Sequence, residues 1–160
     1  MRGNTLKYQL VTTLTEEDNI AIMDLWNQEY PASLSYTSLT DFENYIKGLL
    51  APIHILVRSD HHLVGWAAKF DRGNQRWFAI ILSSIIQGRG LGSNLMNRLK
   101  KNEQELNGWV IDHDLGIKIN NDRYRSPLGF YTKNGFVLEA NQRLELPNLS
   151  AVKVTWTNNI

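Results

Sequence analysis

Apolar residues recur along this chain at two different spacings, and each spacing predicts a different kind of element. In four segments the spacing is three or four residues, which places apolar side chains on one face of a helix. Thr15 and Ser126 are suitable N-cap residues, and Asn107-Gly108 is expected to end the third helix. The four predicted helices run from Thr15 to Pro31, from Ser38 or Thr40 to just before Pro52, from about Gly90 to Glu105, and from Ser126-Pro127 to Asn134-Gly135.

Runs with strict alternation, or short continuous apolar runs, predict strands instead. The segments of this kind are residues 8–14, 54–58, 63–70, 76–82, 109–112, 136–138 and 151–156. Polar turns at 59–62 and 71–74 are short enough for antiparallel hairpins. Segment 76–82 is apolar on both faces, which predicts a place near the centre of a sheet. Residues 115–122 follow neither spacing and predict a loop, and the last strand is expected to follow a loop around Pro147.

The resulting order of elements is β-α-α-β-β-β-α-β-α-β-β. Hairpins among the early strands and β-α-β connections later in the chain predict an α/β protein with one mixed sheet. A chain of 160 residues suits one domain with a substantial core. No linker, repeat or low-complexity segment interrupts it, so we expect a single domain over residues 1–160.

Composition narrows the possible functions. The apolar fraction of 42%, the charged fraction of 21% and the net charge of +1 are those of a globular chain, and they offer no electrostatic argument for a nucleic-acid partner. The absence of cysteine excludes disulfides, thiolate zinc sites and a cysteine nucleophile. Residues 1–14 lack the sustained apolar run of a signal peptide, and no run is long enough to span a membrane. We therefore expect a cytoplasmic protein that binds no membrane.

The strongest local signal is the run Gln87-Gly88-Arg89-Gly90-Leu91-Gly92, placed between a strand pattern and a helix pattern. Glycines allow a tight turn whose N–H groups converge at a helix N-terminus, which is a site for a phosphate or another anion. A P-loop would need a lysine after the last glycine, and none is there. A dinucleotide site would need a glycine at Ser93 and no residues between strand and glycines, whereas 83–86 intervene.

The same run matches the pattern Gln/Arg-x-x-Gly-x-Gly/Ala, and here the chain resembles the GNAT superfamily of acyl-CoA-dependent N-acetyltransferases. Ile80-Ile81-Leu82-Ser83 is similar to the family's fourth strand. About forty residues after the glycines, Phe130-Tyr131-Thr132-Lys133-Asn134-Gly135-Phe136 is similar to the family's second motif. The resemblance covers roughly residues 76 to 138, whereas the N-terminal half agrees only in the order of its elements.

The resemblance implies a GNAT-like fold with splayed fourth and fifth strands and a site for acetyl-CoA as cosubstrate. The glycine run would hold the pyrophosphate through its backbone, and the fourth strand would hold the pantetheine arm through backbone groups. Arg89 could add a charge contact or could point to water. The residues expected to bind the cosubstrate are Leu82, Ser83, Ser84, Gln87, Gly88, Arg89, Gly90, Leu91, Gly92 and Ser93.

In the same family a tyrosine gives a proton to the leaving thiolate, and Tyr131 occupies that position. A phenol is a suitable acid for this step, although a buried tyrosine that only packs in the core would look the same in sequence. The sequence differs from the family pattern at the catalytic base, because the fourth strand lacks a carboxylate and Tyr124 replaces the usual asparagine. His113 or Asp112, after the fifth strand, could act as the base; Glu29 is a further candidate, or no dedicated base is needed.

The acceptor is expected to be a small-molecule amine or a peptide amine, bound near the first two helices. Trp26, Glu29 and Tyr30 are the candidate contacts there, with Tyr36 nearby, and each of the aromatic residues could instead simply pack. His61-His62 lies in a tight turn and has no third ligand at suitable spacing, so we expect no metal. The chain is expected to be a monomer or a homodimer. A non-catalytic CoA-binding sensor or regulatory module is the alternative function.

Overall fold

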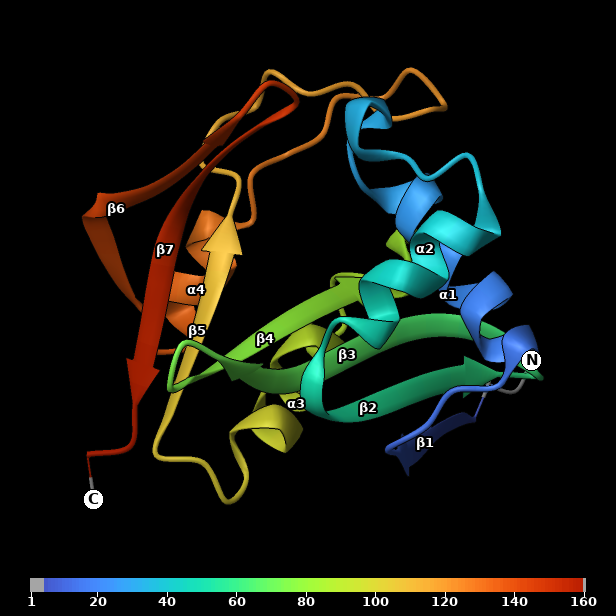
Figure 1. The fold of residues 1–160 in the computed structure, drawn as a ribbon, viewed down its shortest axis with the longest axis horizontal. Helices are drawn as coiled ribbons and strands as arrows, with labels where there is room; N and C mark the ends of the chain where they lie inside the picture. The colour runs from blue at the N-terminus through green and yellow to red at the C-terminus, as the bar shows by residue number, and fades with distance from the viewer. Residues whose placement is uncertain (1–4, 160) are drawn as a thin grey trace.

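The computed structural model describes residues 5–159, which form one seven-stranded sheet between two layers of helices (Figure 1). The strand order is β1-β2-β3-β4-β5-β7-β6. Helices α1 and α2 cover one face, and α3 and α4 lie behind the other. The elements are β1 (Leu6–Val11), α1 (Glu16–Glu29), η1 (Ala32–Leu34), α2 (Leu39–Lys47), β2 (Leu50–Ser59), β3 (His62–Arg72), β4 (Gln75–Leu82), η2 (Ser84–Ile86), α3 (Leu91–Lys100), β5 (Glu105–Val110), α4 (Leu128–Lys133), β6 (Val137–Leu146) and β7 (Leu149–Thr157).

The predicted order of helices and strands and the mixed α/β class are confirmed. The helix starts show why local sequence was sufficient. Thr15 and Asp18 form a reciprocal capping box, in which each side chain accepts a 3.0 Å hydrogen bond from the other residue's backbone N–H. Ser38 caps α2 in the same manner, with its hydroxyl accepting from the N–H of Asp41 at 3.2 Å. No described helix is long and apolar enough to cross a membrane.

The predicted helix from Gly90 to Glu105 is wrong at its C-terminal end. Helix α3 ends at Lys100, and Leu106, which has the spacing of the helix's apolar face, belongs to β5 instead. The ammonium of Lys69, on β3, donates to the carbonyl oxygens of Leu99 at 3.0 Å and Lys101 at 2.9 Å. It also pairs with Glu103 at 2.9 Å. A cation from a neighbouring strand thus caps the last carbonyls of the helix, which helical spacing alone does not reveal.

The C-terminal strands are longer than predicted. Residues 139–146 continue β6, and the expected loop around Pro147 is only a short link between β6 and β7. Strand β6 lies at the edge of the sheet, where most of its residues are exposed, and its register shifts between Glu139 and Arg143. An exposed edge strand with a bulge shows no regular apolar alternation, so the pattern did not predict it.

Strands β4 and β5 diverge at the centre of the sheet. They are parallel, and among the described residues their register holds a single pair, Trp77 with Asn107. Beyond that pair the two strands separate (Figure 1). Each face of the sheet is covered by its own apolar core. One core contains Phe78 and residues of α3 and α4, and the other contains Trp66 and residues of α1 and α2. We call the region between the diverging strands the opening; β4 and β5 have no paired residues there.

Candidate functional site

The glycine run forms a turn in which two glycines are required by backbone conformation. Gly88 has φ +83° and Gly90 has φ +74°, the left-handed region that disfavours other residues. Gly90 is the N-cap of α3 and provides no side-chain cap. Within residues 5–159, the backbone N–H groups from Gly88 to Ser93 make no hydrogen bond. Consecutive N–H groups without partners at a helix N-terminus are suited to binding a phosphate or pyrophosphate.

The third glycine of the run is required by packing. A Cβ at Gly92 would lie 2.9 Å from Cε1 of Phe130, which is closer than real Cβ contacts. Phe130 lies on α4, so its ring fixes α4 against the first turn of α3. The glycine run and the motif from Phe130 to Phe136 are therefore in direct contact, although they are about forty residues apart.

Strand β4 presents free backbone edges toward the opening. Ser83 donates its N–H to the carbonyl of Val64 on β3 at 2.8 Å. Because hydrogen bonding alternates along an antiparallel pair, Leu82 and Ile80 direct their backbone groups to the opposite side, toward β5. The side-chain amide of Gln87 donates to the carbonyl of Leu82 at 2.8 Å.

Among the three residues expected to bind pantetheine through the backbone, only Leu82 faces the opening. Ser83 faces β3, and Ser84 donates its N–H to Glu29 at 3.0 Å. Ile80 is not predicted by the sequence, because the direction of its backbone groups depends on the register of β4 with β3.

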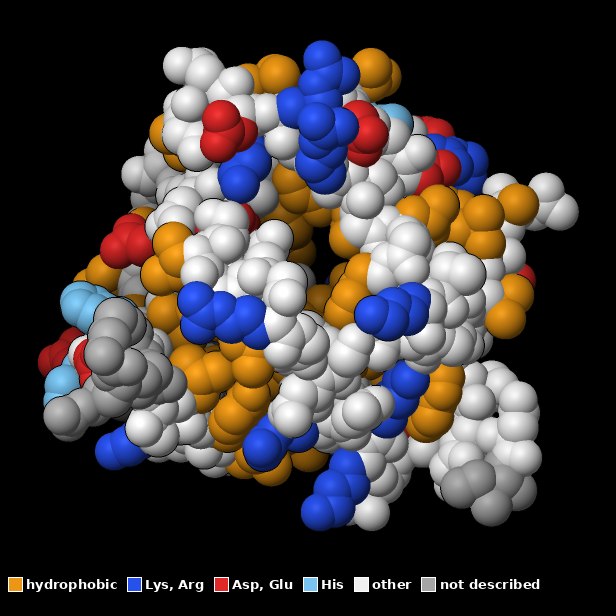
Figure 2. Space-filling model, turned by 180° about the vertical axis from the view of Figure 1, so that it is seen from behind, with side chains coloured by type: hydrophobic (Ala, Val, Ile, Leu, Met, Phe, Trp, Pro, Cys, Tyr) orange, Lys and Arg blue, Asp and Glu red, His pale blue; other side chains and the backbone are white. Residues whose placement is uncertain are grey.

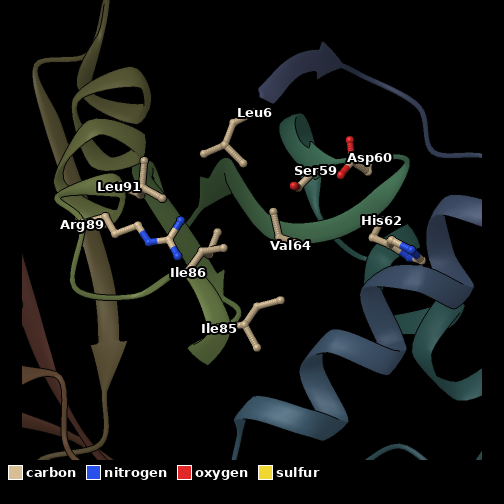
Figure 3. Close-up of a pocket in the computed structure, with 9 residues that line it drawn as sticks. All are labelled: Leu6, Ser59, Asp60, His62, Val64, Ile85, Ile86, Arg89 and Leu91. Carbon is tan, nitrogen blue, oxygen red and sulfur yellow. The ribbon is translucent and has the colours of Figure 1, made fainter. Parts of the chain in front are cut away.

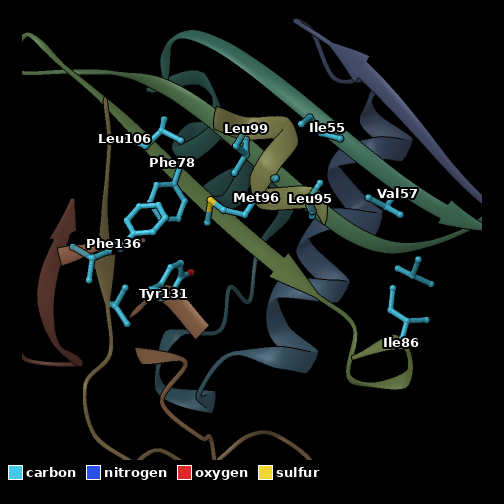
Figure 4. Packing of buried hydrophobic residues seen from close by; sticks show 14 residues of the cluster. Ile55, Val57, Phe78, Ile86, Leu95, Met96, Leu99, Leu106, Tyr131 and Phe136 are labelled. Carbon is cyan, nitrogen blue, oxygen red and sulfur yellow. The ribbon is translucent and has the colours of Figure 1, made fainter. Parts of the chain in front are cut away.

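Tyr131 lies on α4 and is 7% exposed. Its ring packs against Phe78 at 5.7 Å and Phe136 at 5.6 Å between centroids, and its oxygen points away from Phe136 (Figure 4). Its hydroxyl has no hydrogen-bond partner among the described residues. Burial raises the pKa of Tyr131 above its ordinary value of 10, and nearby Tyr124 raises it further. The phenol is therefore protonated and available as a donor at neutral pH.

Two further tyrosines lie near Tyr131. The rings of Tyr30 and Tyr124 are 6.3 Å apart. Burial raises the pKa of Tyr124 to about 12, and the pKa of Tyr30 is raised by burial and by the nearby phenols of Tyr124 and Tyr131. The position where the family has asparagine thus carries a neutral phenol beside the candidate acid.

The two predicted base residues are both engaged. Asp112 makes a bidentate ion pair with Arg143, with oxygen–nitrogen distances of 2.8 and 3.1 Å, and this hydrogen bonding lowers the pKa of Asp112. His113 accepts a hydrogen bond at Nδ1 from the N–H of Leu115 at 3.1 Å. A neutral imidazole that accepts at Nδ1 carries its proton on Nε2, so His113 presents a donor in this arrangement.

Glu29 is 7% exposed and connects three segments. One carboxylate oxygen accepts hydrogen bonds from the backbone N–H and the hydroxyl of Ser84, and the other pairs with Lys118 at 3.2 Å. Trp26 donates its indole N–H to the carbonyl of Leu34 at 2.9 Å, and its ring lies 4.6 Å from that of Tyr30. Glu29 and Trp26 thus connect α1 to η1, to η2 and to the segment between β5 and α4.

Arg89 borders a cavity of about 370 Å³ beside the glycine run (Figure 3). Its guanidinium lies near Ile86, across the cavity from Asp60 and His62. It forms no ion pair with a described acidic residue. In the described part of the chain no group of three His, Asp or Glu side chains could hold a metal. The cavity is lined by Leu6, Ser59, Asp60, His62, Val64, Ile85, Ile86, Arg89 and Leu91.

A second cavity, of about 340 Å³, lies between η1, the segment after β5 and the β6–β7 hairpin. We call it the connector cavity. The hydroxyl of Ser33 donates to the carbonyl of Asn148 at 3.4 Å, and the Asn148 amide donates to the carbonyl of Ser33 at 3.3 Å. Apart from this cavity, the view from behind shows a central hollow bordered by hydrophobic side chains (Figure 2). The connector cavity is lined by Pro31, Ser33, Leu34, Ile111, His113, Leu115, Gly116, Leu146, Pro147, Asn148, Leu149 and Ser150.

Comparisons with known proteins agree with the observed fold and identify the family of the chain. The sequence matches the family model of the acetyltransferase (GNAT) domain over residues 51–138, more than half of the chain. No curated protein matches the sequence.

Several solved structures share the fold. An acyl-CoA N-acyltransferase from Pseudomonas aeruginosa is 15% identical with a TM-score of 0.65, over 96% of this chain and 100% of that one. An aminoglycoside 6'-acetyltransferase type Ii is 16% identical with a TM-score of 0.66, over 93% and 96%. A GNAT superfamily phosphinothricin acetyltransferase from Sinorhizobium meliloti, in complex with acetyl-CoA, is 12% identical with a TM-score of 0.65, over 94% and 88%.

Proposed function

The chain belongs to the GNAT acetyltransferase family, and from this premise we propose that it is an N-acetyltransferase that moves the acetyl group of acetyl-CoA to a primary amine. The observation that carries the proposal is the run of N–H groups from Gly88 to Ser93, which have no partner among the described residues and lie beside the opening between β4 and β5. Relatives of this fold named for aminoglycoside and phosphinothricin support a small-molecule amine as acceptor.

The donor would be held mainly by backbone groups. The N–H groups of the glycine run suit a pyrophosphate, and Arg89 is free to add a charge contact. The backbone groups that Ile80 and Leu82 direct toward β5, apart from the Leu82 carbonyl that accepts from Gln87, suit an extended arm that lies along β4. The bound thioester supplies an activated acetyl group.

The acceptor amine would attack the thioester carbon directly, while both substrates are bound. A cysteine acyl-enzyme is impossible because the chain contains no cysteine. A C–N bond forms, the C–S bond breaks, and Tyr131 gives its proton to the sulfur. Burial raises the pKa of Tyr131, and the same buried surroundings also destabilise a thiolate, so the proton still passes to sulfur. Tyr131 then regains a proton from solvent or from the amine.

We propose no dedicated carboxylate base. Asp112 is paired with Arg143, Glu29 with Lys118, and His113 presents an N–H donor at Nε2. The neutral fraction of the amine would therefore be the reactive form, and its proton would leave to water after attack. Activity should accordingly rise with pH toward the pKa of the acceptor.

Three measurements test the proposal. Thermal unfolding with CoA, NAD or ATP should show stabilisation by CoA alone, because a ligand that binds only the folded state raises stability. Release of free CoA thiol from acetyl-CoA should then depend on an added amine. Tyr131→Phe should lower turnover about a hundredfold or more while leaving the CoA shift in place.

Two results would contradict the proposal. Stabilisation by NAD without CoA would remove the family-based assignment of the ligand. Stabilisation by CoA with no thiol release for any amine would favour the non-catalytic CoA-binding module instead. That module is consistent with the missing carboxylate on β4 and with the engaged Asp112.

A further inference from the structure

We propose that part of the segment between β5 and α4 is a docking surface for a second copy of this chain, and that it binds the acidic face of that copy's α1. The inference goes beyond the proposed function and does not depend on acetyl transfer. The segment runs across the top of the molecule in Figure 1, and we call its residues 115–125 the finger. The finger is a short antiparallel pair, in which Ile117 bridges to Arg123 and the N–H of Tyr124 donates to the carbonyl of Gly116 at 2.8 Å.

Alternation along the finger gives it two different faces. The inner face is attached to the body of the protein, because Lys118 pairs with Glu29 and the ring of Tyr124 lies near that of Tyr30. Asp122 is opposite Lys118 in the antiparallel pair and therefore belongs to the inner face. The outer face carries the remaining large side chains, which are Leu115, Ile117, Ile119, Arg123 and Arg125.

The outer face is both apolar and basic. Leu115, Ile117 and Ile119 are 78%, 47% and 58% exposed, so their burial in an interface would remove apolar surface from water. Arg123 and Arg125 are also exposed, and neither forms an ion pair with a described acidic residue. Figure 2 shows both hydrophobic and basic side chains at the upper end of the molecule. This face therefore fits a partner that is apolar and acidic.

A protein surface suits the outer face better than a membrane or a nucleic acid does. Attraction to an anionic membrane takes clusters of roughly four to eight basic residues, whereas the finger has two on this face, with the exposed Asp114 and Asp122 nearby. The outer face also has no aromatic ring on which a base could stack. Aliphatic residues beside arginines are typical of protein–protein interfaces.

The complementary surface lies on α1 of the same chain. Glu17, Ile20 and Asp24 have helical spacing and share one face of α1, and Ile20 is 41% exposed. Helix α1 contains no Lys or Arg, and neither Glu17 nor Asp24 forms an ion pair in the described part of the chain. An aliphatic side chain between two unpaired carboxylates matches aliphatic side chains beside two unpaired guanidinium groups.

A copy cannot make this contact with its own finger. Lys118 attaches the finger to Glu29, at the C-terminal end of α1, whereas Glu17 lies about 18 Å away along the helix. Two copies whose α1 helices are antiparallel about a two-fold axis bring each finger to the acidic end of the other copy's α1. The contact then forms twice and closes, which gives a dimer and not a filament.

Sedimentation equilibrium tests whether the chain associates. The wild type should dimerise between micromolar and millimolar concentration at low ionic strength, where salt screens the charge pairs least. A chain that stays monomeric over this range overturns the proposal. Thiol release from acetyl-CoA is measured separately, so failure of the dimer is distinguishable from failure of the proposed function.

Charge reversal identifies the two surfaces. The double variants Arg123→Glu/Arg125→Glu and Glu17→Lys/Asp24→Lys should each raise the dimer Kd about tenfold or more, because they place like charges opposite each other. An equimolar mixture of the two variants should restore the wild-type Kd, because each finger then faces an α1 of opposite charge. A mixture that associates no more tightly than the separate variants overturns the proposal.

A matched pair of apolar variants tests the aliphatic part of the contact. Ile117→Asp should weaken the dimer, whereas Leu138→Asp, on β6 and outside both surfaces, should leave its Kd unchanged. Leu138 is 45% exposed, close to the 47% of Ile117, so the two changes are comparable. Circular dichroism verifies that each variant is folded. Equal Kd values for the two variants overturn the assignment of the finger.

Discussion

Glu29 accepts hydrogen bonds from both the backbone N–H of Ser84, at 3.0 Å, and the hydroxyl of Ser84, at 3.2 Å. Glu29 ends α1, and Ser84 begins the short turn that leads from β4 to the glycine run. The carboxylate thus connects the end of α1 to the turn that precedes the glycine run. Its ion pair with Lys118, which is 89 residues away in sequence, adds the segment between β5 and α4 to this connection.

Glu29→Gln should destabilise the protein, because it leaves the largely buried ammonium of Lys118 without a counter-charge. Breaking one side of a buried pair costs about 3 kcal/mol, and we expect a loss of this size in the free energy of unfolding measured with urea. KM for acetyl-CoA should rise as well, because the turn at Ser84 loses its anchor.

The double variant Glu29→Gln with Lys118→Met should recover part of the loss, since no unpaired charge remains. Glu145→Gln serves as a control, because Glu145 pairs with Arg143 at an exposed position and should contribute little. Strictly additive effects of the two single variants would contradict a direct interaction between Glu29 and Lys118.

Gly92→Ala should reduce both stability and CoA binding. The new methyl group would meet the ring of Phe130, and overpacking of this kind costs about 1–3 kcal/mol. Gly129→Ala is the matched control on the neighbouring helix α4, where an added Cβ meets nothing within 4 Å. That variant should be neutral or stabilising by about 0.5–1 kcal/mol, because alanine favours the helix. Urea unfolding and thermal shift with CoA measure the two effects, and equal behaviour of both variants would argue against the Phe130 contact.

The proposed acid should remain functional in alkaline solution. Burial raises the pKa of Tyr131 above 10, so the phenol keeps its proton at any pH where the enzyme is normally assayed. We therefore expect kcat at saturating substrates to show no decline between about pH 7 and pH 10. Tyr131→Phe should lower kcat throughout this pH range, whereas Tyr124→Phe should retain most of the wild-type kcat. A decline of the wild-type kcat centred below pH 10, with the fold intact by circular dichroism, would contradict the assignment.

Mild acid should destabilise the fold through His54. This residue is 1% exposed, and burial lowers its pKa from 6.5 to about 4. In the unfolded chain His54 takes up a proton near pH 6.5, whereas in the folded chain it does so only near pH 4. The free energy of unfolding is therefore highest above pH 6.5 and falls as the pH decreases from 6.5 to about 4. A shift of this size corresponds to about 3 kcal/mol.

Urea unfolding between pH 7 and pH 4 measures this contribution. His54→Gln should flatten the dependence, because the amide does not titrate and its oxygen can still accept the indole N–H of Trp66. His62→Gln, at an exposed position, should retain the pH dependence of the wild type. An unchanged slope in His54→Gln would show that other groups cause the acid sensitivity.

Local sequence was sufficient wherever the determining interactions span only a few residues. The capping box of Thr15 and Asp18 marks the start of α1, and the left-handed φ angles of Gly88 and Gly90 follow from two glycines in one short turn. The order of helices and strands and the glycine turn at the start of α3 therefore follow from the sequence alone. The family pattern around Tyr131 adds the type of donor, since its spacing from the glycine run is also a property of the sequence.

The tertiary structure decided every feature that depends on partners far apart in the chain. Lys69 ends α3 from a neighbouring strand, Arg143 pairs with Asp112 from β6, and Lys118 pairs with Glu29 from the segment between β5 and α4. An acidic residue in a sequence can be a base, a ligand or one partner of an ion pair. Only the position of a cation that is distant in the sequence distinguishes these roles. For the same reason the sequence by itself determined the tight turn at Gly88 and Gly90, whereas the cavity beside Gly116 exists only once three separate segments are brought together.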